Sequence, residues 1–190
     1  MSEAFGVEIA NCLSALSKGE IILYPTDTVW GIGCDATNPE AIEKIYALKK
    51  RPSSKALICL VADDFMLESY VEHVPDLAYD IMDLATKPTT IIYDNPKGVA
   101  KNLIADDNSL AIRVASDKFC RNLIKRFKKP IVSTSANIGG QKTPATYSEI
   151  EEDILKGVDY VVNLDRDKKT SASSAIIKLG NDGLVQVIRE

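Results

Sequence analysis

Short apolar runs alternate with segments of helical periodicity along nearly the whole chain, and this alternation limits the chain to few architectures. Apolar runs this short, bounded by turn residues, are typical of buried strands. Apolar residues three or four positions apart, as in Ile9, Cys12 and Leu16, predict helices that pack on a sheet. The final two runs are joined by a turn at Gly180–Gly183 and predict a hairpin. We therefore expect an α/β fold, a twisted sheet of mixed parallel and antiparallel strands flanked by helices, in a single domain over residues 1–190.

The pattern also gives approximate positions for the elements. The expected strands are 21–24, 56–61, 89–93, 110–114, 158–164, 175–179 and 184–188, with one more starting at Ile131. The expected helices are 7–18, 39–48, a short helix that ends at Tyr70, 76–86, 117–127 and one that ends at Lys156. Asn38 is the expected N-cap of the second helix, and Asp63 or Asp64 that of the third. The last helix is expected to begin with a capping box formed by Thr146 and Glu149.

Composition excludes several classes of protein. A net charge of −4 gives no overall preference for nucleic acid, and the four cysteines are too widely spaced for a zinc site or a disulfide framework. The N-terminus lacks an apolar signal segment and no run is long enough to span a membrane, so we expect a soluble, cytoplasmic protein. His73 is the single histidine, which argues against hydrolases that use histidine as general base.

Two strands end in clusters of small polar side chains. Thr26, Asp27 and Thr28 follow the first strand, and the segment from Ser133 to Asn137 follows the strand that starts at Ile131. Ligands bind beyond strand ends in open sheets flanked by helices, so both clusters are candidate binding sites. Such side chains also cap turns by bonding to nearby backbone groups. The first cluster alone slightly favours the capped turn, and the second cluster favours a binding function.

Cations gather in a loop after the second helix, and one arginine lies within an apolar strand. Arg113 is either at an exposed edge or beside an anion, because arginine is rarely buried without a partner. The loop cations also complement a helix C-terminus, which needs no ligand. Phosphate groups would suit this set, since charge-assisted bonds are stronger than neutral ones. The candidate anion ligands are Lys49, Arg51, Lys55 and Arg113, with Ser133, Ser135, Asn137 and Thr143 as neutral donors.

Three motifs together resemble the YrdC-like family, whose active members are L-threonylcarbamoyladenylate synthases. They are Pro25-Thr26-Asp27-Thr28-Val29-Trp30-Gly31, Lys49-Lys50-Arg51-Pro52, and Ser133-Thr134-Ser135-Ala136-Asn137 with Gly140. The resemblance runs from about Ile9 to Arg189 and is to the short form without an additional C-terminal domain. It implies the YrdC-like fold and a reaction of ATP, L-threonine and bicarbonate that gives threonylcarbamoyl-AMP and pyrophosphate, with Mg2+ on the nucleotide and no metal site in the protein.

The resemblance also implies roles for individual residues and partners. Lys49 and Arg51 would be catalytic and meet the ATP phosphates, and a partner complex would use the product to modify adenosine 37 of tRNA. The remaining ATP-binding positions would be Ser109, Ser135, Asn137, Thr143 and Arg189. The threonine-binding positions would be Thr26, Arg113, Ser133 and Ser174.

Several positions depart from the family pattern, and other functions stay open. Lys87-Pro88 stands in a segment that usually reads Trp-Pro-Gly-Pro-Leu-Thr, and Leu60 replaces a frequent histidine. A family member that has lost the activity is therefore one alternative. Another is a tRNA or double-stranded RNA binding module of the same fold without synthase activity. Weak RNA binding is also expected of a synthase. A serine hydrolase that uses Ser133 or Ser135 lacks a histidine to activate the serine.

Overall fold

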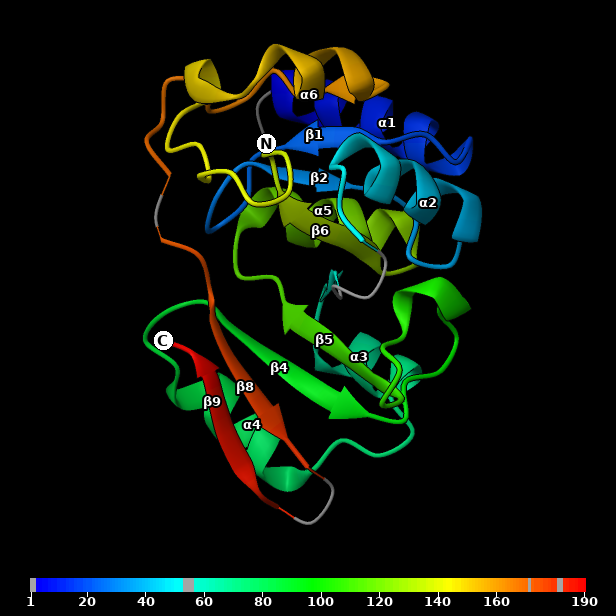
Figure 1. Cartoon of the computed structure of the whole chain (residues 1–190), viewed down its shortest axis with the longest axis vertical. Helices are drawn as coiled ribbons and strands as arrows, with labels where there is room; N and C mark the ends of the chain where they lie inside the picture. The colour runs from blue at the N-terminus through cyan, green and yellow to red at the C-terminus, as the bar shows by residue number, and fades with distance from the viewer. Residues whose placement is uncertain (1–2, 53–56, 171, 181–182) are drawn as a thin grey trace.

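The computed structural model describes residues 3–52, 57–170, 172–180 and 183–190. Nine strands within these ranges form one mixed sheet in the order β7-β1-β2-β6-β3-β5-β4-β8-β9 (Figure 1). The strands are β1 (Ile22–Tyr24), β2 (Gly31–Gly33), β3 (Ile58–Val61), β4 (Thr89–Asp94), β5 (Ser109–Val114), β6 (Ile131–Ser135), β7 (Tyr160–Val161), β8 (Ala175–Leu179) and β9 (Val185–Arg189). The helices are α1 (Glu3–Ser17), α2 (Pro39–Leu48), α3 (Asp64–Tyr70), α4 (Asp76–Leu84), α5 (Lys118–Phe127) and α6 (Glu152–Gly157), with 3-10 turns η1 (Lys101–Leu103) and η2 (Tyr147–Glu149). The predicted α/β fold with a mixed sheet is confirmed.

Two apolar clusters lie on opposite faces of the sheet because strand side chains alternate in direction. In β3, Cys59 and Val61 belong to the cluster that α2 covers, whereas Leu60 between them belongs to the cluster that α1 and α5 cover. Burial of each such aliphatic side chain stabilises the fold by about 1.5–3 kcal/mol. The apolar run of β3 is therefore buried on both faces of the sheet, whereas that of β9 is exposed.

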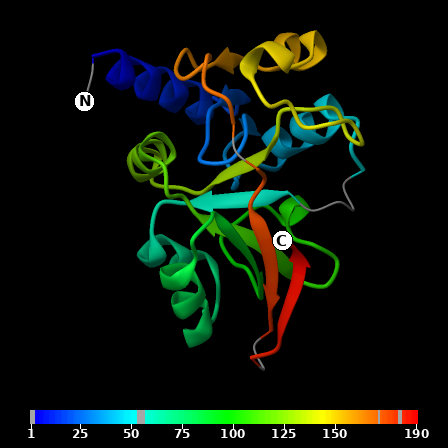
Figure 2. The same ribbon diagram turned by 90° about the vertical axis from the view of Figure 1, so that its left-hand side faces the viewer.

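The part of the sheet formed by β4, β8 and β9 is covered differently. Helices α3 and α4 pack on one side of it (Figures 1 and 2). The strands lie in front of these helices in Figure 1 and beside them in Figure 2. Strand β8 is parallel to β4, and β9 returns antiparallel to β8 as the predicted hairpin. The start of β8 and the end of β9 therefore lie side by side, with Ile176 opposite Arg189.

The predicted starts of α2, α3 and α5 are confirmed, whereas α1 begins at Glu3, four residues before the expected start. Asn38 accepts a hydrogen bond from the Ala41 amide, and Asp63 and Asp117 cap α3 and α5 in the same way. The capping box was wrong: Thr146 makes no side-chain capping bond, η2 begins there, and α6 starts only at Glu152. The Glu149 carboxylate instead accepts the Ala145 amide.

Strand lengths were predicted less well. Strand β7 covers only two residues of the expected 158–164, because β1 offers it only Ile22 and Leu23 as partners. The apolar segment after Thr28 forms β2, a separate strand antiparallel to β1. The prediction for Lys55 and the expected start of the 56–61 strand at Ala56 lie outside the described residues. Within the described residues, no helix has the length and apolarity needed to cross a membrane.

Candidate functional site

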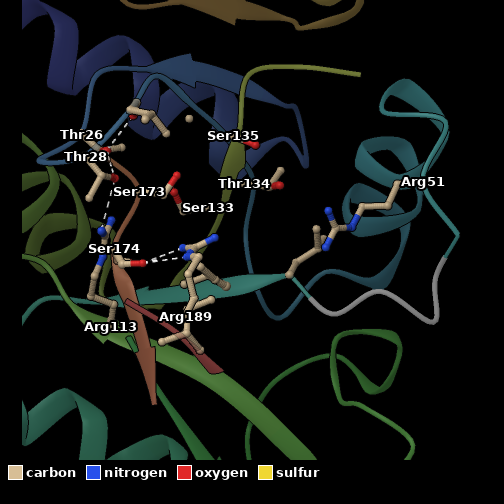
Figure 3. A pocket seen from close by; sticks show the side chains of 15 residues that line it. Thr26, Thr28, Arg51, Arg113, Ser133, Thr134, Ser135, Ser173, Ser174 and Arg189 are labelled. Atoms are coloured by element: carbon tan, nitrogen blue, oxygen red, sulfur yellow. Dashed lines mark hydrogen bonds between the residues drawn. The ribbon is translucent and has the colours of Figure 1, made fainter. Parts of the chain in front are cut away.

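A cavity of about 170 Å³ lies where the turn between β1 and β2 meets the end of β6 and the start of β8 (Figure 3). Strand β2 joins the two polar clusters, since it pairs with β1 on one side and with β6 on the other. Gly31 lies opposite Ser135 in that pairing. The lining residues are Thr26, Thr28, Val29, Gly31, Arg51, Leu57, Ile58, Arg113, Ser133, Thr134, Ser135, Ser173, Ser174, Ile176 and Arg189.

The turn after β1 is held by a chain of hydroxyl groups. Thr26 Oγ1 donates to the Val29 carbonyl at 2.7 Å and accepts the Thr28 amide at 3.0 Å. Since its one proton is used on Val29, the 3.0 Å contact with Thr28 Oγ1 has Thr28 as donor. Thr28 Oγ1 in turn accepts from the Arg113 guanidinium at 3.3 Å. The first polar cluster is therefore both a bonded turn and part of a cavity wall.

A buried ion pair fixes Arg113 under this turn. Its guanidinium lies 3.0 Å from Asp27 Oδ1, and the two side chains are only 5% and 8% exposed. Asp27 Oδ2 accepts the Ser116 hydroxyl at 2.6 Å. Arg113 is thus beside an anion and not at an exposed edge, and Asp27 is its counter-ion. The buried Nε of Arg113 has no hydrogen-bond partner among the described residues.

The loop that follows β6 is supported from behind by Lys49. The Lys49 ammonium is 1% exposed and donates to the carbonyls of Ser135 at 2.5 Å and Asn137 at 2.6 Å. The Gly139 amide donates to the Lys49 carbonyl at 2.7 Å. Burial and the charge of Arg51 lower the pKa of Lys49 to about 8. Lys49 therefore holds the backbone that carries Ser135, and it does not line the cavity.

Arg189 reaches the cavity from β9. It donates to the Ser174 carbonyl through Nε at 2.9 Å and Nη2 at 2.7 Å, while Ser174 Oγ lies 2.8 Å from Thr90 Oγ1 (Figure 3). Partial burial, and then the charge of Arg113, lower the pKa of Arg189. Arg51, Arg113 and Arg189 all line the cavity, and none of the described lining residues is acidic. The cavity therefore favours a ligand with negative charge.

The structure brings most of the predicted site residues together. Those lining the cavity are Thr26, Arg51, Arg113, Ser133, Ser135, Ser174 and Arg189; those outside its lining are Lys49, Ser109, Asn137 and Thr143. The Asn137 amide donates to the carbonyls of Ile138 and Gln141 and so shapes the loop behind the cavity. The Ser109 hydroxyl donates to Asp107 at 2.5 Å, at the opposite end of β5 from Arg113. The nucleotide roles of these residues stay predictions.

Comparison with known proteins identifies the family. A family model described as telomere recombination, for the Sua5, YciO and YrdC proteins, matches residues 14–190. This chain belongs to the Sua5/YciO/YrdC family. The threonylcarbamoyl-AMP synthase of Pseudoalteromonas translucida is 36% identical over 82% of this chain and 84% of its own length. That of Idiomarina loihiensis is 33% identical over 93% and 94%.

Solved structures share the fold of this Sua5/YciO/YrdC member at lower identity. P. abyssi Sua5 complexed with L-threonine has a TM-score of 0.81 and 23% identity over 94% of this chain, which spans about half of that protein (52%). E. coli YciO has a TM-score of 0.80 and 24% identity over 96% of this chain and 88% of its own. A nucleotide-bound HypF structure has a TM-score of 0.82 and 23% identity over 96% of this chain and 28% of its own. The fold is thus shared by differently named proteins.

Some residues of this family member were missed by sequence reasoning. Ser173 lines the cavity beside the predicted Ser174, and Thr28, named in the first polar cluster but given no ligand role, lines it as well. Leu57 and Ile176 also line the cavity, but no pattern in the sequence marks them. Their position depends on which residues of each strand face the cavity. Neither departure from the family pattern lines the cavity: Leu60 packs under α1 and α5, and Lys87-Pro88 lies outside the lining.

Proposed function

We propose that this protein is an L-threonylcarbamoyladenylate synthase, which forms threonylcarbamoyl-AMP and pyrophosphate from ATP, L-threonine and bicarbonate. The observation that carries the proposal is the cavity lined by three arginines and no described carboxylate, beside a turn of small polar groups. Two substrates of this reaction are anions and the third carries a carboxylate. The relatives named threonylcarbamoyl-AMP synthase support the same activity.

We propose that the amino acid binds in the cavity and that the ATP phosphates bind beside it. A volume of about 170 Å³ suits a small amino acid and is well below the roughly 300–1,000 Å³ of pockets that enclose drug-sized ligands. Arg113 is the proposed carboxylate ligand, because Asp27 and Thr28 fix its planar guanidinium and its Nε is unused. Arg51, Ser135 and Arg189 are the proposed contacts of the triphosphate, with Ser109, Asn137 and Thr143 as further predicted nucleotide residues.

The chemistry requires positioning and charge stabilisation more than a protein base. The threonine amine and dissolved CO2 form a carbamate, whose oxygen attacks the α-phosphorus of ATP while the bond to pyrophosphate breaks. Negative charge develops on the departing pyrophosphate, and preorganised cations beside it lower the barrier. One such donor typically contributes about 10²–10³ in rate. Arg51 and Arg189 serve this role, and Lys49 serves it indirectly by fixing the loop of Ser135.

Mg2+ is proposed to enter with ATP. In the described residues, no cluster of histidine, cysteine, aspartate or glutamate side chains could hold a metal ion. Phosphate oxygens and water provide much of the coordination of Mg2+ in many nucleotide-dependent enzymes. The ion would neutralise phosphate charge that the arginines do not reach.

RNA binding is the second candidate function, favoured by the basic outer face of α5. Lys118, Arg121, Lys125 and Arg126 are all exposed there. Lys125 pairs with Asp63 at 3.2 Å, which reduces the charge available to phosphates. A filter-binding salt series tests this function, since binding through phosphates weakens steeply with salt. We propose that tRNA is reached mainly through a modifying partner complex that takes the product.

Release of pyrophosphate tests the main proposal. The assay contains ATP, Mg2+, L-threonine and bicarbonate, and omits each in turn, with mass spectrometry to identify threonylcarbamoyl-AMP. We expect release to require L-threonine and bicarbonate together. Release that proceeds equally well without L-threonine would contradict the synthase function.

A further inference from the structure

A second pocket opens beyond the carboxyl ends of the parallel strands β3 and β5. Its volume is about 450 Å³, within the roughly 300–1,000 Å³ that is typical of pockets for small molecules. Residues after both strands line it, together with residues of α4 and α5 and of the segment before β4. We call it the β3–β5 pocket, and the charged residues of its lining are Asp63, Asp64, Asp83, Lys87 and Arg121.

The helices that follow β3 and β5 pack on opposite faces of the sheet. Leu67 of α3 belongs to the same apolar cluster as Val61. Leu123 of α5 belongs to the other cluster, with Leu60. Where the chain leaves two neighbouring parallel strands towards opposite faces, a crevice forms between their ends, and ligands of open α/β sheets bind in such crevices. The β3–β5 pocket therefore occupies the position of a ligand site in this fold.

The β3–β5 pocket is separate from the arginine-lined cavity. Successive side chains of a strand point to opposite faces. In β5, Arg113 lines the cavity, whereas the next residue, Val114, lines the pocket. No described residue lines both. A ligand of the pocket therefore does not occupy the proposed substrate site.

Three charged side chains of the pocket are not used by the fold. Asp64, Asp83 and Arg121 form no side-chain hydrogen bond or ion pair with any residue that the structure describes. Asp63 is already used, since it caps α3 and pairs with Lys125 at 3.2 Å. Burial raises the pKa of Asp64, and the carboxylates of Asp83 and Asp63 raise it further. An ammonium group would relieve this repulsion, while the planar guanidinium of Arg121 suits an anion.

Ser116 connects the pocket to the cavity. It lines the pocket, and its hydroxyl donates to Asp27 Oδ2 at 2.6 Å. Asp27 is the counter-ion of Arg113, the proposed ligand of the substrate carboxylate. If the Ser116 hydroxyl turned to an anion in the pocket, Asp27 would lose a donor and would attract Arg113 more strongly. Occupation of the pocket should therefore weaken the binding of L-threonine.

We propose that the β3–β5 pocket binds a small zwitterion, with the ammonium group at Asp64 and Asp83 and the acidic group at Arg121 and Ser116, and that this ligand inhibits the enzyme. The binding site goes beyond the proposed synthase function, and only the inhibition rests on that function. The acidic group is a carboxylate or a phosphate, since a guanidinium binds both through two parallel hydrogen bonds.

Calorimetric titration tests the site without turnover. The probes are 4-aminobutyrate and O-phosphoethanolamine, and the controls are butylamine and butyrate, which each carry one of the two charges. We expect a zwitterion to bind about tenfold more tightly than either control, because it makes charge-assisted bonds at both ends. The tighter probe identifies the acidic group.

Substitutions assign the binding to the pocket. Asp83→Asn and Arg121→Met should each weaken it by about tenfold. The matched controls are Asp80→Asn and Arg126→Met, which alter exposed residues of the same helices outside the lining. The site would be overturned if no zwitterion bound more tightly than butylamine and butyrate, or if Asp83→Asn and Arg121→Met bound it as well as their controls do.

Steady-state kinetics of pyrophosphate release tests the inhibition. Saturation with the tighter zwitterion should raise the KM for L-threonine by about fivefold or more, with little change in kcat. Asp83→Asn should keep the native kcat/KM and lose the inhibition, and Ser116→Ala should bind the zwitterion without the rise in KM. An unchanged KM of the native enzyme would overturn the inhibition. A native enzyme without threonine-dependent release would contradict the synthase function and with it the inhibition, whereas calorimetry decides the binding site independently.

Discussion

The two polar segments that bound the cavity resemble each other in sequence but are held in different ways. The turn of Thr26 to Thr28 is held by a buried ion pair, in which Asp27 neutralises Arg113. The loop after β6 is held by Lys49, a buried cation that donates to the backbone carbonyls of Ser135 and Asn137. The threonine hydroxyls of the first segment form hydrogen bonds within the turn and with Arg113. The second segment contributes the serines Ser133 and Ser135 to the cavity lining. Similar composition therefore does not imply a similar role.

Breaking the ion pair should have the largest effect. Arg113→Met leaves the Asp27 carboxylate buried without its counter-ion, which typically costs about 3–5 kcal/mol of unfolding free energy. It also removes the proposed carboxylate ligand, so activity should fall by at least about hundredfold. Urea denaturation and pyrophosphate release measure the two effects.

The double variant Arg113→Met/Asp27→Asn separates stability from function at this pair. It removes both charges, so we expect most of the lost stability to return while activity stays low. If the double variant were as unstable as Arg113→Met, the unpaired carboxylate would not be the cause of the loss.

Loss of the buried lysine should have the next largest effect and a different character. Lys49→Met removes the donors to two loop carbonyls, so the loop of Ser135 should move and kcat should fall by about 10²-fold, with a smaller change in the KM for L-threonine. Lys50→Met is the control, because Lys50 is exposed and lies 3.9 Å from Asp153. Equal activity of the two variants would show that the loop does not depend on Lys49.

These roles explain how far the sequence could predict the site. The family resemblance assigned Thr26, Arg51, Arg113 and Ser133 to one site, and all four line the cavity. The sequence could not show that the Lys49 side chain points to the backbone of the β6 loop and not into the cavity. Its direction depends on how α2 packs against that loop. Ser109 lies far from the cavity because a position four residues before Arg113 reaches the other end of the same strand.

The fold was predictable to a similar extent. Apolar runs located most strands, and N-cap residues located helix starts. Strand β2 and the short β7 were harder, since their lengths depend on which partner strands they meet. The capping box failed because Glu149 bonds the Ala145 amide and a 3-10 turn follows.

The pH dependence of stability should also report on Lys49. Its pKa falls from the ordinary 10.5 to about 8 in the folded protein. Between these values the unfolded chain binds a proton that the folded chain does not, so this group raises the unfolding free energy as pH increases from 8 to 10.5. The native protein should therefore gain stability relative to Lys49→Met across that range in urea titrations. A constant difference would mean that Lys49 keeps its charge.

An exposed ion pair should give the smallest effect. Lys156 and Glu152 lie 2.7 Å apart on α6, but their side chains are 71% and 75% exposed. Lys156→Met should change the unfolding free energy by less than about 1 kcal/mol, because solvent screens such pairs. If Lys156→Met lowered the unfolding free energy as much as Arg113→Met does, buried and exposed ion pairs would contribute equally to stability, against this prediction.

The cavity draws its walls from distant parts of the chain, and this has a consequence for folding. Thr26 comes from the β1–β2 hairpin, Arg113 from β5 and Arg189 from β9, the last strand of the described chain. Contacts between residues so far apart in sequence form slowly, because long loops must close first. The binding cavity should thus be among the last features to appear during refolding, so helical circular dichroism should recover before enzymatic activity does.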